Sequence, residues 1–444
     1  MRLRIEMPAI AGIFATAFAS VFMSASIFVS ASAFVVALDS GPAQAAELSI
    51  VTGFEGRDLQ ILKSNLAVFE DRTGNTVSIV PLPRYTTDQF ERYSLWLTAQ
   101  NEDIDVYLTD ATWAPQLAEH FLDLSEPAAD IIPSHFPATI ESQTANGRLV
   151  ALPLFARAAA LYYRKDLLEK HVAFVPASWT EMVDTARNIQ EAERAGGNSE
   201  MVGFVFAGAP GEDLAANALE WIKSHGGGQI VEPDGTISIN NTRAAEALKN
   251  VLAWIGDVVP EEVLDYDEEA ARQVWNAGNA VFLRAGSDEF GRSKADDSAL
   301  KNRFEMTSLP IGDGGSSPAA TLGGWNVAVS RYTPHPEEAV ELALFLASSD
   351  VQEQRAIQQG KLPTITALYN DPDITTVQPG IRRWKGILEN AVPLPSAATL
   401  QNYNLVISEF WTAVHNTLSA NGSAEENVTI LERRLKRLKS SGWR

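Results

Sequence analysis

Short strand-like apolar runs alternate with longer helix-like patterns along the first part of the chain. An apolar run at 48–52 is followed by leucines at helical spacing that end before Gly74. Similar runs recur at 76–82 and 104–108, with a second helical pattern through Trp96 between them. This order is typical of a doubly wound α/β sheet, whose ligands bind beyond the carboxyl ends of the strands.

The loops that follow these three strands are therefore expected to gather at one edge of the sheet. The first holds Glu55, the second Arg84 and Tyr85, and the third Asp110 with Trp113 just beyond it. All five are candidates for ligand contacts. Asp110 is also suited to cap the helix that follows, Trp113 to fill a core, and Arg84 to remain solvated.

The stretch at 321–330 places two glycines, Gly323 and Gly324, and then Trp325 directly before alternating apolar and polar residues. Adjacent glycines allow φ > 0 or the close approach of another group. A flat aromatic face beside free amide hydrogens suits a ligand with a hydrophobic face and hydroxyls, such as a sugar ring. We expect this stretch to form a wall and hinge of a ligand cleft. The alternative is a turn into a buried strand, with Trp325 in a core.

The same signals continue in the second part of the chain. An apolar stretch at 149–163 indicates a crossing between two lobes. Ser178 and Glu181 have the spacing of a capping box for a helix that ends at Gly196. A glycine-containing turn then precedes another helix, which is expected to begin at Glu212. Glu212 is a further candidate for ligand binding.

The length of the chain favours two lobes. A single core stops growing near ~250–300 residues, and this chain has 444 residues, of which 45% are hydrophobic. We predict an α/β fold in which lobe 1 comprises 46–155 and 326–370, and lobe 2 comprises 156–325 and 371–444. The chain then crosses between the lobes three times, which favours a hinge that opens and closes a cleft on ligand.

The first 45 residues are predicted to be an export signal. Two arginines precede an apolar run from Met7 to Leu38, and Ala43 and Ala45 form an A-x-A cleavage site. The run exceeds the usual ~7–15 apolar residues, so translation from Met23 or retention as an anchor are alternatives. A formal net charge of −21 argues against a nucleic-acid partner.

The chain has no cysteine, which excludes disulfides, thiolate metal sites and a lipid-modified N-terminal cysteine. A protein free in the periplasm is therefore expected. The six histidines form no H-E-x-x-H motif, and nucleophile-elbow, dinucleotide and P-loop motifs are absent. We predict no catalytic residue, metal or cofactor. A glycosidase using two carboxylates, such as Glu55 and Asp110, stays open as the minor alternative.

Several segments resemble one family in order along the chain. Among them are DIDVYLTDATWAPQLAEHFLDL, ALYYRKDLL, ALEWIKSHGGGQIVEPDGTISINN, LGGWNVAVS and LPTITALYNDPDI. They resemble the extracellular solute-binding proteins of carbohydrate ABC transporters, and most closely the trehalose/maltose/sucrose-binding branch. The resemblance implies a two-lobed periplasmic binding protein fold and capture of a sugar by lobe closure. It also implies a monomer that delivers the sugar to a permease heterodimer in the inner membrane, driven by a cytoplasmic ATPase.

The resemblance also assigns roles to individual residues. Asp110 matches the acid that accepts sugar hydroxyls, and Gly324 with Trp325 matches a pair that contacts the disaccharide. Glu55 and the Arg84–Tyr85 pair fall in loops that line the site in relatives. The predicted sugar-binding residues are Glu55, Arg84, Tyr85, Asp110, Trp113, Arg157, Glu212, Gly323, Gly324 and Trp325.

Three positions depart from the family pattern. Arg157 stands where relatives tend to carry an acid, Gly286 where they often carry tryptophan, and Leu394 where arginine is common. Arg157 suggests a sugar bearing a carboxylate, sulfonate or phosphate; alternatively, it pairs with Asp110 or Glu55 across an empty cleft. Two other functions stay open: an exported carbohydrate-active enzyme, and a binding protein that has lost its sugar and acts as a sensor or partner protein.

Overall fold

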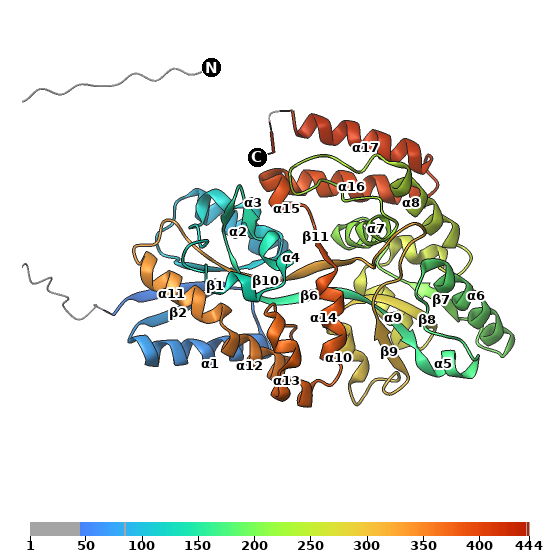
Figure 1. The fold of residues 1–444 in the computed structure, drawn as a ribbon, viewed down its shortest axis with the longest axis horizontal. Helices are drawn as coiled ribbons and strands as arrows, with labels where there is room; N and C mark the ends of the chain where they lie inside the picture. Colours follow the sequence, from blue (N-terminus) through green and yellow to red (C-terminus); the bar gives the residue numbers. More distant parts are fainter. Residues whose placement is uncertain (1–44, 84–85, 441, 444) are drawn as a thin grey trace, which may run out of the picture. The chain divides into compact units, whose positions relative to one another are not determined.

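The computed structural model describes residues 45–83, 86–440 and 442–443 (Figure 1). Almost all of the predicted signal peptide lies outside the described residues, and so do Arg84 and Tyr85. Within the described part, no helix combines the length and the apolar character that a membrane span requires.

The secondary structure follows the chain as labelled in Figure 1. The strands are β1 Glu47–Thr52, β2 Thr76–Pro81, β3 Val106–Asp110, β4 Thr144–Ala145, β5 Arg148–Leu149, β6 Leu152–Arg164, β7 Val202–Val205, β8 Ala280–Gly286, β9 Phe304–Thr307, β10 Ala320–Val329 and β11 Ala391–Pro393. The α-helices are α1 Gly56–Thr73, α2 Thr86–Thr98, α3 Trp113–Gln116, α4 Pro137–Glu141, α5 Lys165–Lys170, α6 Trp179–Ala195, α7 Glu212–Ser224, α8 Thr242–Trp254, α9 Glu268–Asn276, α10 Asp288–Lys294, α11 Pro336–Ala347, α12 Ser349–Gln359, α13 Pro372–Val377, α14 Ile381–Glu389, α15 Ser396–Thr399, α16 Tyr403–Leu418 and α17 Ala424–Leu438. The 3₁₀ helices are η1 Ala118–His120, η2 Ile132–Ser134, η3 Glu261–Asp265, η4 Thr366–Asn370 and η5 Leu400–Asn402.

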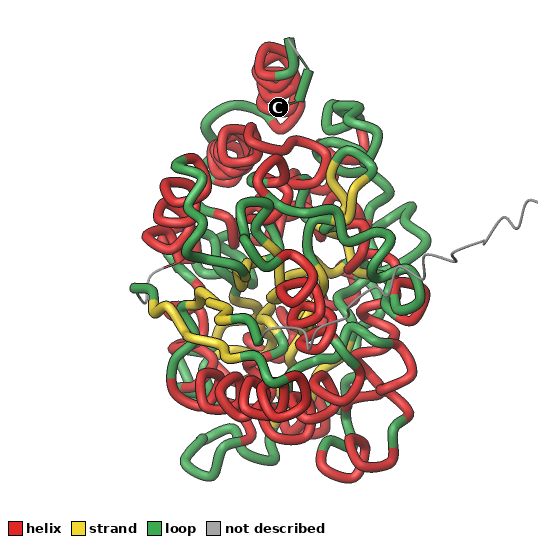
Figure 2. The backbone as a smooth tube through the Cα atoms, turned by 90° about the vertical axis from the view of Figure 1, so that its left-hand side faces the viewer, coloured by secondary structure: helices red, strands yellow, loops and turns green. Residues whose placement is uncertain are grey.

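One mixed sheet organises the described residues. Its main order is β2-β1-β3-β10-β6-β8-β7, with β11 paired to β10 and β9 paired to β6. β1 runs parallel to both β2 and β3, which confirms the doubly wound start of the chain. β10 runs antiparallel to its two neighbours β3 and β6. Helices lie above and below the strands in Figure 2.

Successive side chains along each strand point to opposite faces of the sheet and therefore pack into separate cores. Val106 and Leu108 of β3 pack with α1 and α11 on one face, whereas Tyr107 packs with α2 on the other. A larger core surrounds β7 and β8 and includes α6, α7, α8, α16 and α17. The strands β6 and β10 contribute residues to the cores at both ends of the sheet. They are therefore the structural link between these ends.

Local signals placed several helix ends correctly. Ser178 and Glu181 form the predicted reciprocal capping box at the start of α6. Gly74 ends α1 with φ 77°, and Gly360 ends α12 with φ 73°. Both glycines occupy the left-handed conformation that a side chain disfavours, so the predicted helix end at Gly74 is confirmed, and Gly360 ends its helix in the same way.

Two predicted boundaries were wrong near the centre of the sheet. The strand expected at 104–108 is β3 Val106–Asp110, because Asp110 pairs with Trp325 of β10. Gly323 and Gly324 lie inside β10, so the alternative of a turn before this strand is wrong. Gly324 has φ 135°, and a Cβ atom there would lie 2.2 Å from the carbonyl oxygen of Phe155. The glycine therefore permits the close approach of β10 and β6.

Gly324→Ala is expected to destabilise the protein by roughly 2–4 kcal/mol, because the methyl group clashes with the backbone of β6 and the φ angle is strained. Urea denaturation measures the free energy of unfolding. The matched control is Gly386→Ala in α14, where a Cβ would meet no atom within 4 Å. The control is expected to be neutral or to stabilise by up to about 1 kcal/mol. Equal stabilities for the two variants would contradict the tight packing at Gly324.

Candidate functional site

Pairing of three strands brings five of the ten predicted residues together. Asp110 of β3 stands opposite Trp325 of β10. On the other side of β10, Trp325 pairs with Phe155 of β6 and Gly323 pairs with Arg157. Residues that are more than 200 positions apart in the sequence are therefore neighbours at the middle of the sheet. The middle of the sheet therefore carries the carboxylate of Asp110, the indole ring of Trp325 and the guanidinium of Arg157 close together.

The Trp325 ring forms part of a small aromatic group. Its edge packs against Phe54 at 5.0 Å between ring centroids and against Trp113 at 5.7 Å. Trp113 is only 7% exposed and packs with the core around Tyr93, whereas Trp325 is half-buried. Trp113 therefore supports the ring of Trp325 from within the core. Trp325 keeps part of its own surface accessible.

Phe54 was missed by sequence reasoning, although its position directly before Glu55 in the loop after β1 was a usable signal. The guanidinium of the fully buried Arg355 lies 5.8 Å from the ring centroids of both Phe54 and Phe155. Burial lowers the pKa of Arg355 to about 10, while the carboxylate of Asp58 acts in the opposite direction. The group therefore stays charged at neutral pH, and the two aromatic faces stabilise it.

Asp110 is held by its own loop. One carboxylate oxygen accepts hydrogen bonds from the backbone N–H and the hydroxyl of Thr112, at 3.2 and 3.3 Å. Thr112 is the N-cap residue of α3, so Asp110 does order the start of that helix. Its second oxygen accepts no hydrogen bond from the described residues. Burial raises the pKa of Asp110, and the bonds from Thr112 and the charge of Arg157 partly offset this.

Arg157 pairs with acids other than those considered from the sequence. Its Nε lies 3.3 Å from Oδ2 of Asp288, and its Nη2 lies 4.0 Å from Oε1 of Glu268. A Cβ at Gly286 would lie 3.3 Å from Nη2 of Arg157. The guanidinium thus occupies the space beside residue 286, so the departures at Arg157 and Gly286 are sterically coupled. Leu394, the third departure, is 7% exposed and packs in the large core.

Glu212 and Asp213 begin α7 and are exposed to solvent. Although part of the Glu212 side chain is accessible to solvent, the surrounding protein desolvates its carboxyl group and raises its pKa to about 7, and the charge of Asp110 contributes to the same shift. The fully buried Tyr403 has its hydroxyl close to Glu212 and Thr112. The charge of Asp110, at the end of β3, therefore acts on Glu212 at the start of α7.

Two hollows have linings that do not include the Asp110–Trp325 pair. Glu55 lines a hollow of about 260 Å³ together with Arg57, Asp58 and Lys361. A second hollow of about 850 Å³ has a lining that includes His135, Pro137, Gly235 and Trp443. Neither lining contains Asp110 or Trp325.

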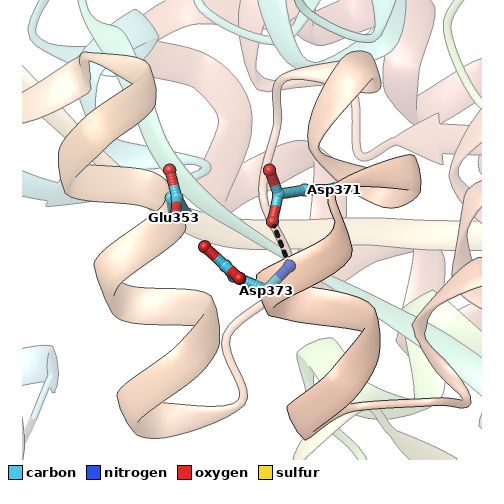
Figure 3. A group of neighbouring side chains, drawn as sticks. All are labelled: Glu353, Asp371 and Asp373. Atoms are coloured by element: carbon cyan, nitrogen blue, oxygen red, sulfur yellow. Dashed lines mark hydrogen bonds between the residues drawn. The ribbon is translucent and has the colours of Figure 1, made fainter.

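Glu353, Asp371 and Asp373 form an acidic group at the start of α13 (Figure 3). Asp371 accepts hydrogen bonds from the backbone N–H groups of Asp373 and Ile374, and so caps this helix. Burial raises the pKa of Glu353, and the neighbouring aspartates add to the rise. Helix capping accounts for the position of Asp371.

Comparison with known proteins identifies related chains. A model of the bacterial extracellular solute-binding protein family matches residues 56–353. A “Probable ABC transporter-binding protein” of Deinococcus radiodurans is 37% identical over 404 residues, which are 90% of this chain and 96% of that protein. The structure of maltose-bound T. maritima MalE3 has a TM-score of 0.75 at 33% identity and covers 89% of this chain and 100% of that one.

The cyclic alpha-maltosyl-1,6-maltose binding protein of Arthrobacter globiformis has a TM-score of 0.76 at 20% identity, and the match covers 90% of this chain and 100% of that one. These matches confirm the predicted fold class, a two-lobed α/β binding protein with a hinge and an interlobe cleft. The family resemblance expected from the sequence is confirmed as well.

The raised pKa of Glu212 predicts a pH-dependent stability. A carboxyl group with a folded-state pKa of about 7, against a usual 4.5, binds its proton more tightly in the folded protein. The contribution of this tighter proton binding to the free energy of unfolding is fully present below about pH 4.5. It is lost as the pH rises through 7. Glu212→Gln is therefore expected to match the wild type in melting temperature at pH 4.5 and to exceed it at pH 8.

Calorimetric melting across this pH range measures the effect. Glu191→Gln, on the exposed face of α6, is the control and is expected to follow the wild type at every pH. Parallel curves for Glu212→Gln and the wild type would show that Glu212 titrates as an ordinary surface carboxylate.

Proposed function

We infer that this chain is the sugar-capturing component of an ABC importer, because it belongs to the bacterial extracellular solute-binding protein family. The observation that carries the inference is the pairing of Asp110 with the half-buried Trp325 at the centre of the sheet. The relative from T. maritima was solved with maltose bound, which supports a carbohydrate as the solute.

The proposed site uses two kinds of contact. The free carboxylate oxygen of Asp110 accepts hydrogen bonds from sugar hydroxyls, and the accessible face of Trp325 covers the apolar side of the ring. Glu212 and Tyr403 supply further polar groups from the opposite side. Gly323 and Gly324 keep the strand beside the ring free of side chains. We also propose that the loops and wall around the sugar contain Arg84, Tyr85, Glu55 and Trp113.

The sugar is proposed to close two lobes, comprising 46–155 with 326–370 and 156–325 with 371–444. The cores support this division in both long strands. In β6, Phe155 packs with the core near β1, whereas Ala156 packs with the large core. In β10, Leu322 belongs to the large core and Val327 to the core near β1. A sugar bound by both Asp110 and Glu212 would bridge the two halves, so binding favours the closed form.

The family supports an extracytoplasmic site of action. We propose that the mature chain is a periplasmic monomer, released from the signal peptide at 1–45. In the closed form it presents the sugar to a permease heterodimer driven by a cytoplasmic ATPase. We propose no enzymatic step, since recognition by hydroxyl acceptors and one aromatic face requires no bond to break.

The function is tested by calorimetric titration with maltose, trehalose and sucrose. Asp110→Asn is expected to weaken binding of the recognised sugar by roughly 10–100-fold, because a hydrogen bond to a charged acceptor contributes ~1.5–3 kcal/mol. Trp325→Leu is expected to weaken it by about tenfold through loss of the aromatic face. Thermal melting first establishes that each variant is folded.

Asp130→Asn serves as the matched control, since Asp130 is an exposed aspartate elsewhere on the surface. It is expected to bind like the wild type. Unchanged affinity in folded Asp110→Asn would remove Asp110 from the site.

A further inference from the structure

Arg355 of α12 is a buried cation without a polar partner. Its side chain is fully buried, and its Nε and both Nη atoms make no hydrogen bond with the described residues. A buried guanidinium that forms no hydrogen bonds carries a large desolvation cost. An apolar side chain of similar size would avoid that cost, so the presence of a charge at this position calls for an explanation.

The carboxylate whose charge acts on Arg355 is that of Asp58, and it is engaged with other groups. Its Oδ1 accepts a hydrogen bond from the side-chain amide of Gln359, and its Oδ2 lies 3.6 Å from Nζ of Lys361. Asp58 therefore reduces the cost of the buried charge from a distance, without bonding to it. The direct contacts of the guanidinium are aromatic.

Two phenylalanine rings flank the guanidinium. The Cζ atom of Arg355 lies 5.8 Å from the ring centroid of Phe54 and equally far from that of Phe155. Phe155 has a second cation, because Nζ of Lys361 lies 4.9 Å from its centroid. Among the described residues, Arg355 is the one cation over the ring of Phe54. Loss of its charge would therefore act mainly on Phe54.

Phe54 in turn contacts the indole of the proposed sugar site. Its ring meets that of Trp325 edge to face, with 5.0 Å between centroids and 68° between planes. Phe54 is thus held by a cation on one ring and by an aromatic contact on the other. Arg355 itself is fully buried, so any effect of it on a sugar passes through this ring.

We propose that Arg355 is a positioning residue, whose guanidinium holds Phe54 against Trp325 and thereby fixes the indole face that receives the sugar. The inference rests on the proposed sugar site and adds to it a residue that does not touch the ligand. The buried charge lowers the stability of the free protein. The ordered ring lowers the entropy that is lost when the sugar binds.

Arg355→Met is the variant that separates this role from a role in the fold alone. Methionine fills much of the same space without the charge, so the melting temperature is expected to stay equal or to rise. Affinity for the tightest binder among maltose, trehalose and sucrose is expected to fall roughly 3–10-fold, because the aromatic contact is no longer held in place. Thermal melting and calorimetric titration measure the two effects.

Arg433→Met is the matched control, since it removes an exposed arginine from α17. It is expected to leave both the melting temperature and the affinity unchanged. Wild-type affinity in Arg355→Met would overturn the proposal. A lower melting temperature together with weaker binding would assign Arg355 to the fold alone, and would overturn the proposal as well.

A double-mutant cycle with Phe54→Leu tests the route through Phe54. This variant is expected to weaken sugar binding by itself, because it removes the ring that supports Trp325. Adding Arg355→Met to it is expected to have almost no further effect, since residues that act through one contact are not additive. Losses of affinity that add would show that Arg355 does not act through Phe54.

Fluorine-19 NMR gives a readout that needs no sugar. With 4-fluorophenylalanine placed at position 54, the wild type and Arg433→Met are expected to show one narrow resonance. Arg355→Met is expected to show a broadened or split one. Identical spectra for all three proteins would overturn the ordering of Phe54 by Arg355. If none of the three sugars binds the wild type, the proposed sugar function is contradicted, and this spectrum alone decides whether Arg355 positions the ring.

Discussion

The pairing of β10 with both β3 and β6 is the constraint on which the site depends. Backbone hydrogen bonds along β10 place Asp110 on one side of Trp325 and Phe155 on the other. The close approach of the two strands requires glycine at 324, where any Cβ would overlap the carbonyl of Phe155. A single residue without a side chain therefore lets acid, indole and guanidinium share one region of the sheet.

Electrostatic compensation around this pairing then decides what the region can bind. Arg284 forms a buried ion pair with Glu220, whereas Arg157 lies near Asp288 and Glu268 and its charge also acts on Asp110. Charged groups surrounded by protein carry a desolvation cost, and like charges add to it. Hydroxyl donors from a ligand reduce that cost. The same residues thus connect the stability of the free protein to ligand binding.

Features set by a few neighbouring residues could be predicted from the sequence. The capping box of Ser178 and Glu181 depends on a spacing of three residues, and Gly74 ends its helix through its own φ angle. The α/β class followed from hydrophobic periodicity. The end of β3 was misplaced because Asp110 enters the strand only through its pairing with a residue more than 200 positions away.

The arrangement of the candidate residues was predicted only in part, for a similar reason. Resemblance to a family placed Asp110 and Trp325 on a shared site, and the structure makes them neighbours. The partners of Arg157 belong to α9 and α10, and nothing local to Arg157 indicates them. Tyr403 enters from a helix near the end of the chain. Such contacts depend on the packing of distant segments, which sequence spacing does not encode.

A crystal structure of the mature protein with its tightest-binding disaccharide tests the central claim most directly. The account predicts a sugar ring against Trp325, with a hydroxyl bonded to the free carboxylate oxygen of Asp110 and residues of both lobes in contact. A sugar bound instead in the hollow beside His135 and Trp443, with Asp110 and Trp325 untouched, would contradict it.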